Sequence, residues 1–217
     1  MGEIRQRLAA ILAADVAGYT KHMATDATAT VDALDAARLV FREHIEGKSG
    51  RVVDMAGDSV LAVFETATGA TEAALAIQKA LAGRDMQFRI GVHLGEVIEK
   101  PDGTVYGDGV NLAARLEGLA TPGGVCISAA VSDQVANKID DAFDDIGEHS
   151  VKNVEKPVHA FAWGGVSDAA QAVERRKPTV AMGAFEARGG EDAEALADGL
   201  RAAVATSLSN QTGIDLV

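Results

Sequence analysis

The sequence has little cysteine, few aromatic side chains and fewer basic than acidic residues. Its 217 residues include one cysteine, so no disulfide can form within the chain and a cysteine-rich zinc site is excluded. Aromatic residues make up 4%, too few for a stacking platform that binds single-stranded nucleic acid. The formal net charge of -12 argues against nucleic-acid binding, because phosphate backbones are held mainly by Lys and Arg.

Long apolar runs are also missing. No run is long enough to cross a membrane, and the short one near the N-terminus ends at Asp15 and lacks the pattern of a secretory signal. We therefore expect a cytoplasmic protein with no membrane segment in these residues. Hydrophobic residues make up 47%, which predicts a packed core, and the length fits one full domain and part of another.

The first part of the chain shows patterns typical of alternating strands and helices. Residues 8–14 form an apolar run that periodicity alone leaves open between a buried strand and a short helix. A helix follows after a cap at Thr25 or Asp26. Its predicted buried stripe has helical spacing and comprises Val31, Leu34, Ala37, Phe41 and Ile45.

Two β-rich runs on either side of Gly57 and Asp58 predict a hairpin. An Ala-rich helix, a strand at 87–98 and a helix at 108–119 follow. The order strand, helix, strand, strand, helix, strand predicts an α+β fold with a ferredoxin-like βαββαβ core, a mostly antiparallel sheet and helices on one face. Strands at 125–128, 142–151 and 158–163 and a helix at 129–135 extend it by a C-terminal βαββ-type portion.

The composition changes after residue 165. We expect a first domain over residues 1–165 and a polar, charged linker over 166–177. Residues 178–217 have the pattern of a strand, a helix and a strand. Because such a unit cannot bury both faces of its own sheet, we expect it either to pack on the first domain or to be the start of a second module, cut short.

Two acidic residues follow apolar strands. In a ferredoxin-like sheet the first strand lies beside the central hairpin, so Asp15 and Asp58 are expected to converge. Paired carboxylates suit Mg²⁺, which prefers oxygen ligands and shares them with substrate phosphates. From this pattern alone two ordinary turn aspartates remain the alternative, since Asp is a common turn residue.

A second candidate lies on the helix at 108–119. Asn111 and Arg115 are four residues apart and project from one side of it, beside a predicted buried stripe of Leu112, Leu116 and Leu119. The arginine fork suits phosphate oxygens, and an amide both donates and accepts hydrogen bonds. A solvated strip on an amphipathic helix is the alternative. His93, in a strand pattern, is expected to be packed or hydrogen-bonded rather than a metal ligand.

Four segments together are more specific than any one of them: residues 13–20 (AADVAGYT), 56–58 (AGD), 88–95 (FRIGVHLG) and 106–115 (YGDGVNLAAR). In order and spacing they resemble the class III nucleotidyl cyclases of bacterial type, the adenylate and guanylate cyclase catalytic domain. The similarity extends from about Arg7 to Trp163. Residues 178–217 resemble, more loosely, the start of a TolB-like module.

The cyclase resemblance implies roles for individual residues. Asp15 and Asp58 match the metal-binding aspartates and Val16 supplies a backbone carbonyl, for two Mg²⁺ or Mn²⁺ ions in each active site. Gly18, Tyr19 and Thr20 match the turn that approaches the nucleotide phosphates. Lys152 matches a phosphate-binding lysine late in the domain.

Asn111 matches the residue that orients the ribose, and Arg115 the one that stabilises the transition state at the α-phosphate. In this family the two aspartates come from one subunit and the Asn/Arg pair from the other. The resemblance therefore implies a homodimer with shared active sites at its interface.

The base-selecting positions depart from the common adenylate cyclase pattern. They hold Asp54, where a lysine is frequent, and Thr104. An ionised Asp54 can only accept hydrogen bonds, from the adenine 6-amino group or from the N1–H and 2-amino edge of guanine. We favour ATP because Thr104 resembles the bacterial adenylate cyclases, with GTP as the alternative.

The predicted function is thus conversion of ATP to 3′,5′-cyclic AMP and pyrophosphate for intracellular signalling. One alternative is a guanylate cyclase. Another is a regulatory cyclase-like domain of low activity that binds nucleotide and dimerises. A polymerase-like or diguanylate-cyclase palm would share the fold and the paired carboxylates. The Asn111–Arg115 helix and the missing GG[DE]EF-type turn argue against that class.

Overall fold

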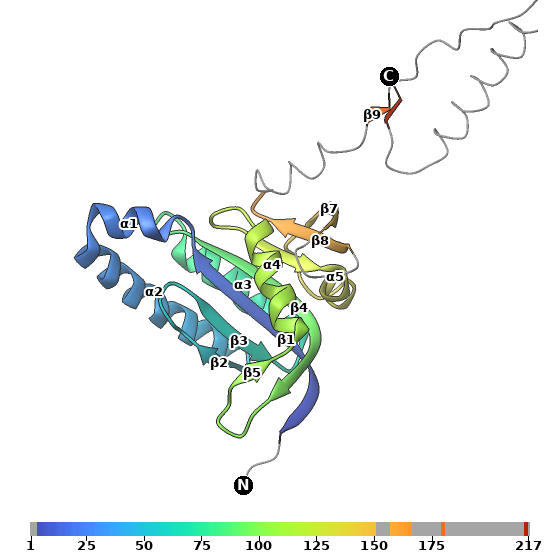
Figure 1. Cartoon of the computed structure of the whole chain (residues 1–217), viewed down its shortest axis with the longest axis horizontal. Coiled ribbons are helices and arrows are strands. Elements are labelled where there is room, and N and C mark those ends of the chain that lie inside the picture. Colours follow the sequence, from blue (N-terminus) through green and yellow to red (C-terminus); the bar gives the residue numbers. More distant parts are fainter. Residues whose placement is uncertain (1–3, 151–156, 166–178, 181–214, 217) are drawn as a thin grey trace, which may run out of the picture. The chain divides into compact units, whose positions relative to one another are not determined.

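The computed structural model describes residues 4–150, 157–165, 179–180 and 215–216 (Figure 1). The chain divides into two compact units, Met1–Gln171 and Ala172–Val217. In the second unit the described residues form two parallel strands, β9 (Thr179–Val180) and β10 (Asp215–Leu216). The predicted linker at 166–177 and the helix expected between these strands lie outside the described residues, so the domain assignment stays a prediction.

The described strands and helices of the first unit follow the predicted order, with α1 and β5 as additions. The strands are β1 (Arg5–Val16), β2 (Gly50–Asp54), β3 (Val60–Phe64), β4 (Phe88–Glu99), β5 (Val105–Tyr106), β6 (Val125–Ser128), β7 (Asp144–His149) and β8 (Val158–Trp163). The helices are α1 (Tyr19–Thr25), α2 (Ala27–Gly47), α3 (Ala67–Leu81), α4 (Asp108–Leu119) and α5 (Ala129–Val135). None of the helices within the described ranges is long and apolar enough to span a membrane.

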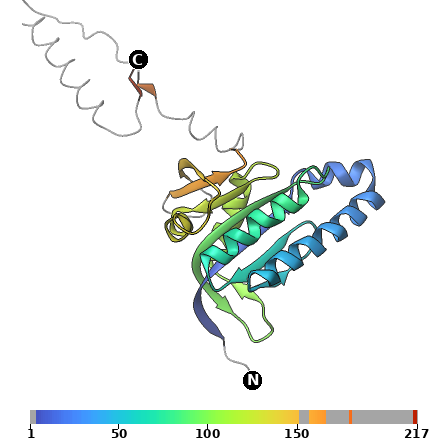
Figure 2. The same ribbon diagram turned by 180° about the vertical axis from the view of Figure 1, so that it is seen from behind.

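The strands form one sheet in the order β2-β3-β1-β4-β6-β8-β7, with β5 paired to β4 (Figures 1 and 2). The first four strands of that order are the ferredoxin-like core. Neighbouring strands run antiparallel except β4 and β6, which are parallel. The α+β class and the mostly antiparallel sheet are confirmed.

The ambiguity of the first apolar run is resolved in favour of a strand. β1 lies between β3 and β4 and is paired with both. Residues 9–14 are all buried, because helices cover both faces of the sheet here. A strand buried on both faces is apolar at every position and does not alternate between apolar and polar residues. The hydrophobic period therefore could not distinguish this strand from a helix.

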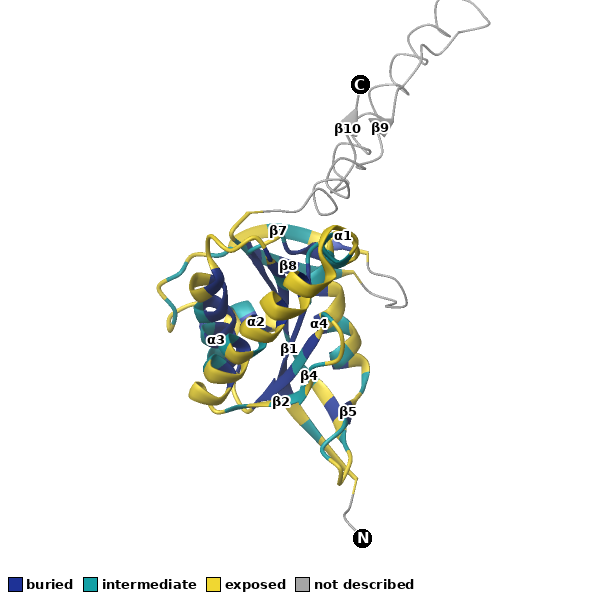
Figure 3. Ribbon diagram, turned by 90° about the vertical axis from the view of Figure 1, so that its left-hand side faces the viewer, coloured by how far each residue is buried: buried dark blue, intermediate teal, exposed yellow. Residues whose placement is uncertain are grey.

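The larger core lies between the sheet and the helices α2 and α3 (Figure 3). Asp26 caps α2, its carboxylate accepting a hydrogen bond of 2.9 Å from the amide of Ala29. Val31, predicted on the buried stripe, is 43% exposed, and Thr30 takes its place. The Thr30 hydroxyl donates to the carbonyl of Asp26, so this polar side chain can be buried at the helix start.

The third predicted helix, α4, lies on the opposite face of the sheet (Figure 3). The two helices of the predicted βαββαβ core, α2 and α3, share one face as expected, and α4, which follows that core, covers the other face. Gly91 of β4 makes this possible, because a Cβ there would collide with the backbone of Ala113 and Glu117. Leu112 is half-buried, whereas Gly109, Ala113, Leu116 and Leu119 are buried.

Candidate active site

The end of β1 places Asp15 against β4, where its register partner is Arg89. The Arg89 guanidinium donates from Nε to Asp15 Oδ1 at 2.9 Å and from Nη2 to Oδ2. This two-pronged ion pair is the strongest arrangement of these two groups. The hydrogen bond that Arg89 donates to Asp15 is the largest influence on the pKa of the Arg89 guanidinium, and it raises this pKa.

A third charged residue, Glu117 of α4, completes this corner. Its Oε1 lies 3.2 Å from Nη2 of Arg89, and its side chain is only 13% exposed. Burial, with Asp15 adding to the effect, raises the pKa of Glu117 to about 8. Glu117 Oε1 is buried and has no hydrogen-bond partner among the described residues. We call Asp15, Arg89 and Glu117 the acidic corner.

Asp58 lies in the turn between β2 and β3, two residues before Val60. Val60 pairs with Ala14 of β1, the residue next to Asp15. It is close enough to influence the pKa values of Arg89 and Glu117. The predicted convergence of the two strand-end aspartates is thus consistent with these electrostatic effects.

The Asp58 turn is held from α2 by an arginine. Arg38 Nη2 donates to the carbonyl oxygens of Gly57 at 2.6 Å and Met55 at 3.3 Å, while Nη1 donates to Asp35. Gly57 has a φ of 58°, a left-handed conformation that favours glycine. Arg38 therefore holds the backbone immediately before Asp58.

The donor chemistry of this corner fits a hard divalent cation. Two carboxylates and the carbonyl of Val16 offer oxygen ligands, and a guanidinium now neutralises Asp15. Within the described part of the chain, no cluster of three or more His, Cys, Asp or Glu side chains is arranged as a metal site. A cation held by Asp15, Asp58 and Val16 would need further oxygens, such as those of a nucleotide's phosphates.

The turn after β1 leads directly into α1. Gly18 has a φ of 71° and precedes the first helical residue, Tyr19. No side chain caps this helix start. Among the described residues no side chain accepts a hydrogen bond from the amides of Tyr19 and Thr20, and their contact with phosphates stays a prediction. Lys152 lies outside the described residues, and its role stays a prediction.

Asn111 and Arg115 lie on the outer side of α4, and both are exposed. Neither side chain forms a hydrogen bond or an ion pair with any other residue that the structure describes. The helix beneath them is fixed by backbone packing of Gly91 and Gly109. Both side chains are thus free to contact a ligand or a second chain.

Asp54 lies on the face of the sheet over which the hairpin that carries Thr104 packs. A bulge in β2 pairs Val52 with Ala62 but Asp54 with Leu61, so Asp54 shares a face with Leu61. The β4–β5 hairpin, which carries Thr104, packs over that face, because Val97 and Val105 share a cluster with Leu61.

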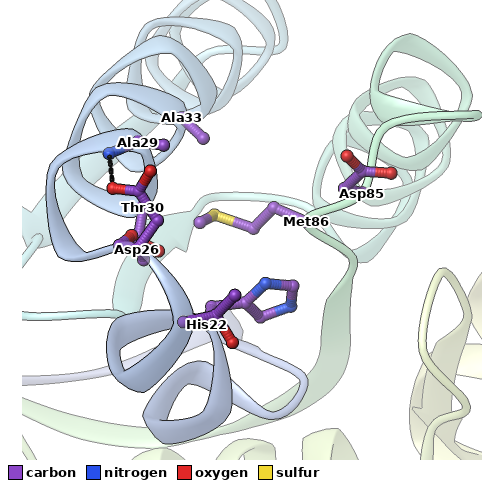
Figure 4. A pocket seen from close by; sticks show the side chains of 8 residues that line it. His22, Asp26, Ala29, Thr30, Ala33, Asp85 and Met86 are labelled. Carbon is purple, nitrogen blue, oxygen red and sulfur yellow. Dashed lines mark hydrogen bonds between the residues drawn. The ribbon is translucent and has the colours of Figure 1, made fainter.

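Two hollows lie elsewhere. One, of about 180 Å³, lies between α1 and α2 and is lined by His22, Asp26, Asp85 and Met86 among others (Figure 4). The other, of about 440 Å³, lies beside the start of α4 and includes His93. Neither includes an acidic-corner residue, Asp58 or Arg115.

His93 is packed and hydrogen-bonded, as predicted. Its Nδ1 lies 2.9 Å from the hydroxyl of Ser128. Burial lowers the pKa of His93 to about 4, so the ring is neutral near pH 7.

Sequence reasoning assigned no role to Arg89, Glu117 or Arg38. Arg89 could have been found from its register partner, since opposite charges facing each other across two strands attract. Glu117 gave no such signal, because its position depends on how closely α4 packs on β4. Arg38 binds backbone carbonyls, which no side-chain pattern reveals.

A mostly antiparallel α+β sheet with acidic residues at one strand end and an exposed Asn/Arg pair on an outer helix is the architecture of a nucleotidyl cyclase domain. A family model described as "Adenylate and Guanylate cyclase catalytic domain" matches residues 4–163. The chain belongs to this family.

Relatives agree. "Putative adenylate cyclase 3" of Rhizobium meliloti is 38% identical over 233 residues, covering 99% of this chain and 40% of the relative. The chain thus spans about two fifths of that relative's length. The solved "Adenylate/Guanylate Cyclase/Hydrolase" of Silicibacter pomeroyi is 37% identical with a TM-score of 0.66, covering 74% of this chain and 98% of that one. The solved adenylyl cyclase CyaB of P. aeruginosa shares the fold, with a TM-score of 0.67 and 22% identity. The match covers 76% of this chain and 96% of the CyaB chain.

Proposed function

We propose that this chain converts ATP to 3′,5′-cyclic AMP and pyrophosphate, in a homodimer that holds two Mg²⁺ or Mn²⁺ ions in each active site. The observation that carries the proposal is the contrast between Asp15, held in a charged corner near Asp58, and Arg115, exposed without a partner among the described residues. Two carboxylates suit a metal–triphosphate, and a free guanidinium suits the phosphate on which charge develops.

The reaction is an in-line attack of the ribose 3′-hydroxyl on the α-phosphorus, with pyrophosphate leaving. Metal ions bound by Asp15, Asp58 and Val16 would lower the pKa of the hydroxyl and neutralise the triphosphate. Asn111 orients the ribose, and Arg115 donates to the α-phosphate oxygens as their charge grows. The amides of the Gly18–Thr20 turn, and Lys152, contact the phosphates.

Arg89 gains a role in this scheme. Its guanidinium now occupies the carboxylate that a cation would take. A cation held by Asp15 would compete with Arg89 for this carboxylate, while Glu117 would remain beside Arg89. The guanidinium would then have donors available for phosphate oxygens.

A dimer with shared sites accounts for the exposure of Asn111 and Arg115. It also accounts for exposed large apolar side chains at one end of the sheet. Leu8 is 60% exposed, Ile98 41% and Tyr106 49%. In register, Tyr106 faces Ile98 and Ile98 faces Gln6, so these side chains are near neighbours. Such clusters are typical of interfaces.

Asp54 bears on the choice of purine. Its carboxylate can accept from the 6-amino group of adenine or from the edge of guanine, and Thr104 can serve either base. The relatives named adenylate cyclase favour ATP. The guanylate cyclase alternative rests on Asp54, as does the alternative of a regulatory domain that binds nucleotide but has low activity.

The same proposal extends to the rest of the chain. Residues 1–165 are the catalytic domain, 166–177 the linker and 178–217 the start of a TolB-like module. The similarity to the Rhizobium meliloti protein extends over almost the whole chain and so includes the residues of both proposed units. We place the protein in the cytoplasm.

The test is an initial-rate assay of the concentrated protein with ATP and with GTP, each with Mg²⁺ and with Mn²⁺. We expect metal-dependent formation of cyclic AMP from ATP, faster than the formation of cyclic GMP from GTP. Faster turnover of GTP would establish the guanylate cyclase alternative. Nucleotide binding without turnover under any of the four conditions would establish the regulatory alternative.

A further inference from the structure

The β4–β5 hairpin carries Thr104 in a tightly ordered turn. The amide of Lys100 donates to the carbonyl of Thr104, and that of Gly103 to the carbonyl of Lys100, both at 2.9 Å. The amide of Thr104 donates to the Asp102 carboxylate at 2.9 Å. The turn is internally rigid, so its location is decided by what holds it from outside.

Arg51 of β2 holds this turn. Its Nη1 donates to the carbonyl oxygen of Gly103 at 3.0 Å, and its Nη2 donates to Glu99 Oε1 at 2.5 Å. The second oxygen of Glu99 accepts from Nε of Arg7 at 2.8 Å. The Glu99 carboxylate at the end of β4 thus binds Arg7 of β1 and Arg51 of β2. Arg51 also binds Gly103, the residue before Thr104.

The bulge in β2 makes Arg51 relevant to Asp54. Arg51 pairs with Val63 and Asp54 with Leu61, so the two residues share a face although they are three apart. Without the bulge, the alternation of side chains would turn Asp54 to the other face. Arg51 therefore connects the strand segment that carries Asp54 with the turn that carries Thr104.

We propose that Arg51 is a positioning residue for purine selection: by binding Gly103 and Glu99 it sets Thr104 at a fixed place relative to Asp54. This inference rests on the proposed function, in which Asp54 and Thr104 contact the base. Arg51 contacts neither nucleotide nor metal in this scheme.

The chemistry of the contact requires arginine. A guanidinium presents parallel donors in a fixed fork and can bind a carbonyl and a carboxylate together, whereas an ammonium is a single point charge. Arg7 first, and then Arg51, lower the pKa of Glu99, so the carboxylate stays charged over the working pH range. The Arg51 side chain is 43% exposed, so its loss should leave the fold intact.

The experiment measures kcat/KM for ATP and for GTP in the full chain and in the variants Arg51→Lys, Arg51→Met and Glu99→Gln. We expect the ratio between the two purines to move toward one by about 3- to 10-fold, the range that one hydrogen bond to the base provides. Inhibition by inorganic tripolyphosphate, a probe of the metal and phosphate half, should not change. Melting temperatures confirm that the variants are folded.

A matched control is Lys48→Met. Lys48 forms an ion pair of 2.8 Å with Glu72, and its side chain is 42% exposed, close to the value for Arg51. This variant should leave the purine ratio unchanged. Because Arg51 and Glu99 act through the same contact, their double variant should shift the ratio no further than either single variant.

Three results would overturn the inference: an equal fall with both purines in every variant, a changed tripolyphosphate inhibition, or a wild type that does not discriminate. Absence of cyclic nucleotide from the wild type under all conditions would instead overturn the proposed function. A working cyclase whose purine ratio ignores Arg51 and Glu99 refutes this inference alone.

Discussion

Asp15 and Arg115 carry opposite charges and differ in their surroundings: one is half-buried in an ion pair, and the other is exposed. Asp15 is paired with Arg89 in a half-buried corner with Glu117, and each charge has a neighbour of the other sign. Arg115 is exposed on α4, with no ion pair among the described residues. The charge of Asp15 is thus paired within the chain, whereas that of Arg115 is exposed to solvent. This difference is the one that the proposed dimer requires, in which each active site takes Asp15 from one chain and Arg115 from the other.

The largest expected effect concerns the carboxylate half. Asp58→Asn keeps the shape of the side chain but removes the charge that a metal needs. We expect turnover to fall by at least about 1000-fold, since metal stabilisation is worth several kcal/mol and each 1.36 kcal/mol is tenfold. Initial rates at saturating nucleotide and Mn²⁺ measure it. Asp85→Asn, at another loop edge, is the control, and an equal loss there would contradict the assignment.

The helix half should show a slightly smaller effect. Arg115→Ala should lower turnover by about 100- to 1000-fold, as loss of a transition-state donor does, with a smaller effect on KM. The melting temperature should stay unchanged, because Arg115 has no partner among the described residues. Arg42→Ala, also an exposed helical arginine, is the control. Unchanged turnover in Arg115→Ala would remove this residue from the mechanism.

Mixing the two inactive variants separates the halves directly. In a dimer with shared sites, an equal mixture of Asp58→Asn and Arg115→Ala forms mixed dimers in which one of two sites is intact, restoring about a quarter of wild-type activity. Activity no higher than that of either variant alone would mean that both halves act within one chain.

The smallest effect is on stability in the metal-free protein. The pKa of Glu117 is about 8 in the native state, whereas the carboxyl of an unfolded chain has the ordinary glutamate pKa of 4.5. The native state binds more protons between these values, so its free energy of unfolding falls as pH rises through this window, by at most about 1.4 kcal/mol per pH unit. Urea unfolding at several pH values measures this slope.

Glu117→Gln should remove that slope, and Arg115→Ala should leave it in place. Glu72→Gln, at an exposed acid, is the control for the loss of one carboxylate. An unchanged slope in Glu117→Gln would show that the acidic corner is not the source of the pH dependence, and the contrast between the two halves would be weakened.

The parts of the fold that local patterns govern were predictable. The Asp26 cap, the Gly57–Asp58 turn and the helix at 108–119 each depend on a few neighbouring residues. Other features depend on tertiary packing. β1 could not be told from a helix, since both of its faces are buried, and Val31 was misplaced because Thr30 satisfies its hydroxyl within its own helix.

The candidate site divides along the same line. Asp15, Asp58, Asn111 and Arg115 stand at strand ends or on a helix, where motifs reveal them. The partners of Asp15 could not be found this way: Arg89 requires the strand register, and Glu117 requires the close packing of α4. The bulge that turns Asp54 is set by the pairing of β2 with β3, which no single run of sequence contains.

The close packing at Gly91 has a mechanical consequence. Arg89 lies two residues from Gly91 on β4, and Arg115 lies two residues from Ala113, whose carbonyl a Cβ at Gly91 would strike. In the proposed dimer these two arginines of one chain serve different active sites. Between them the backbone of α4 rests directly on the backbone of β4, with no side chain in between. The spacing between the two arginines of one chain is therefore set by backbone contact rather than by side chains that could adopt other rotamers.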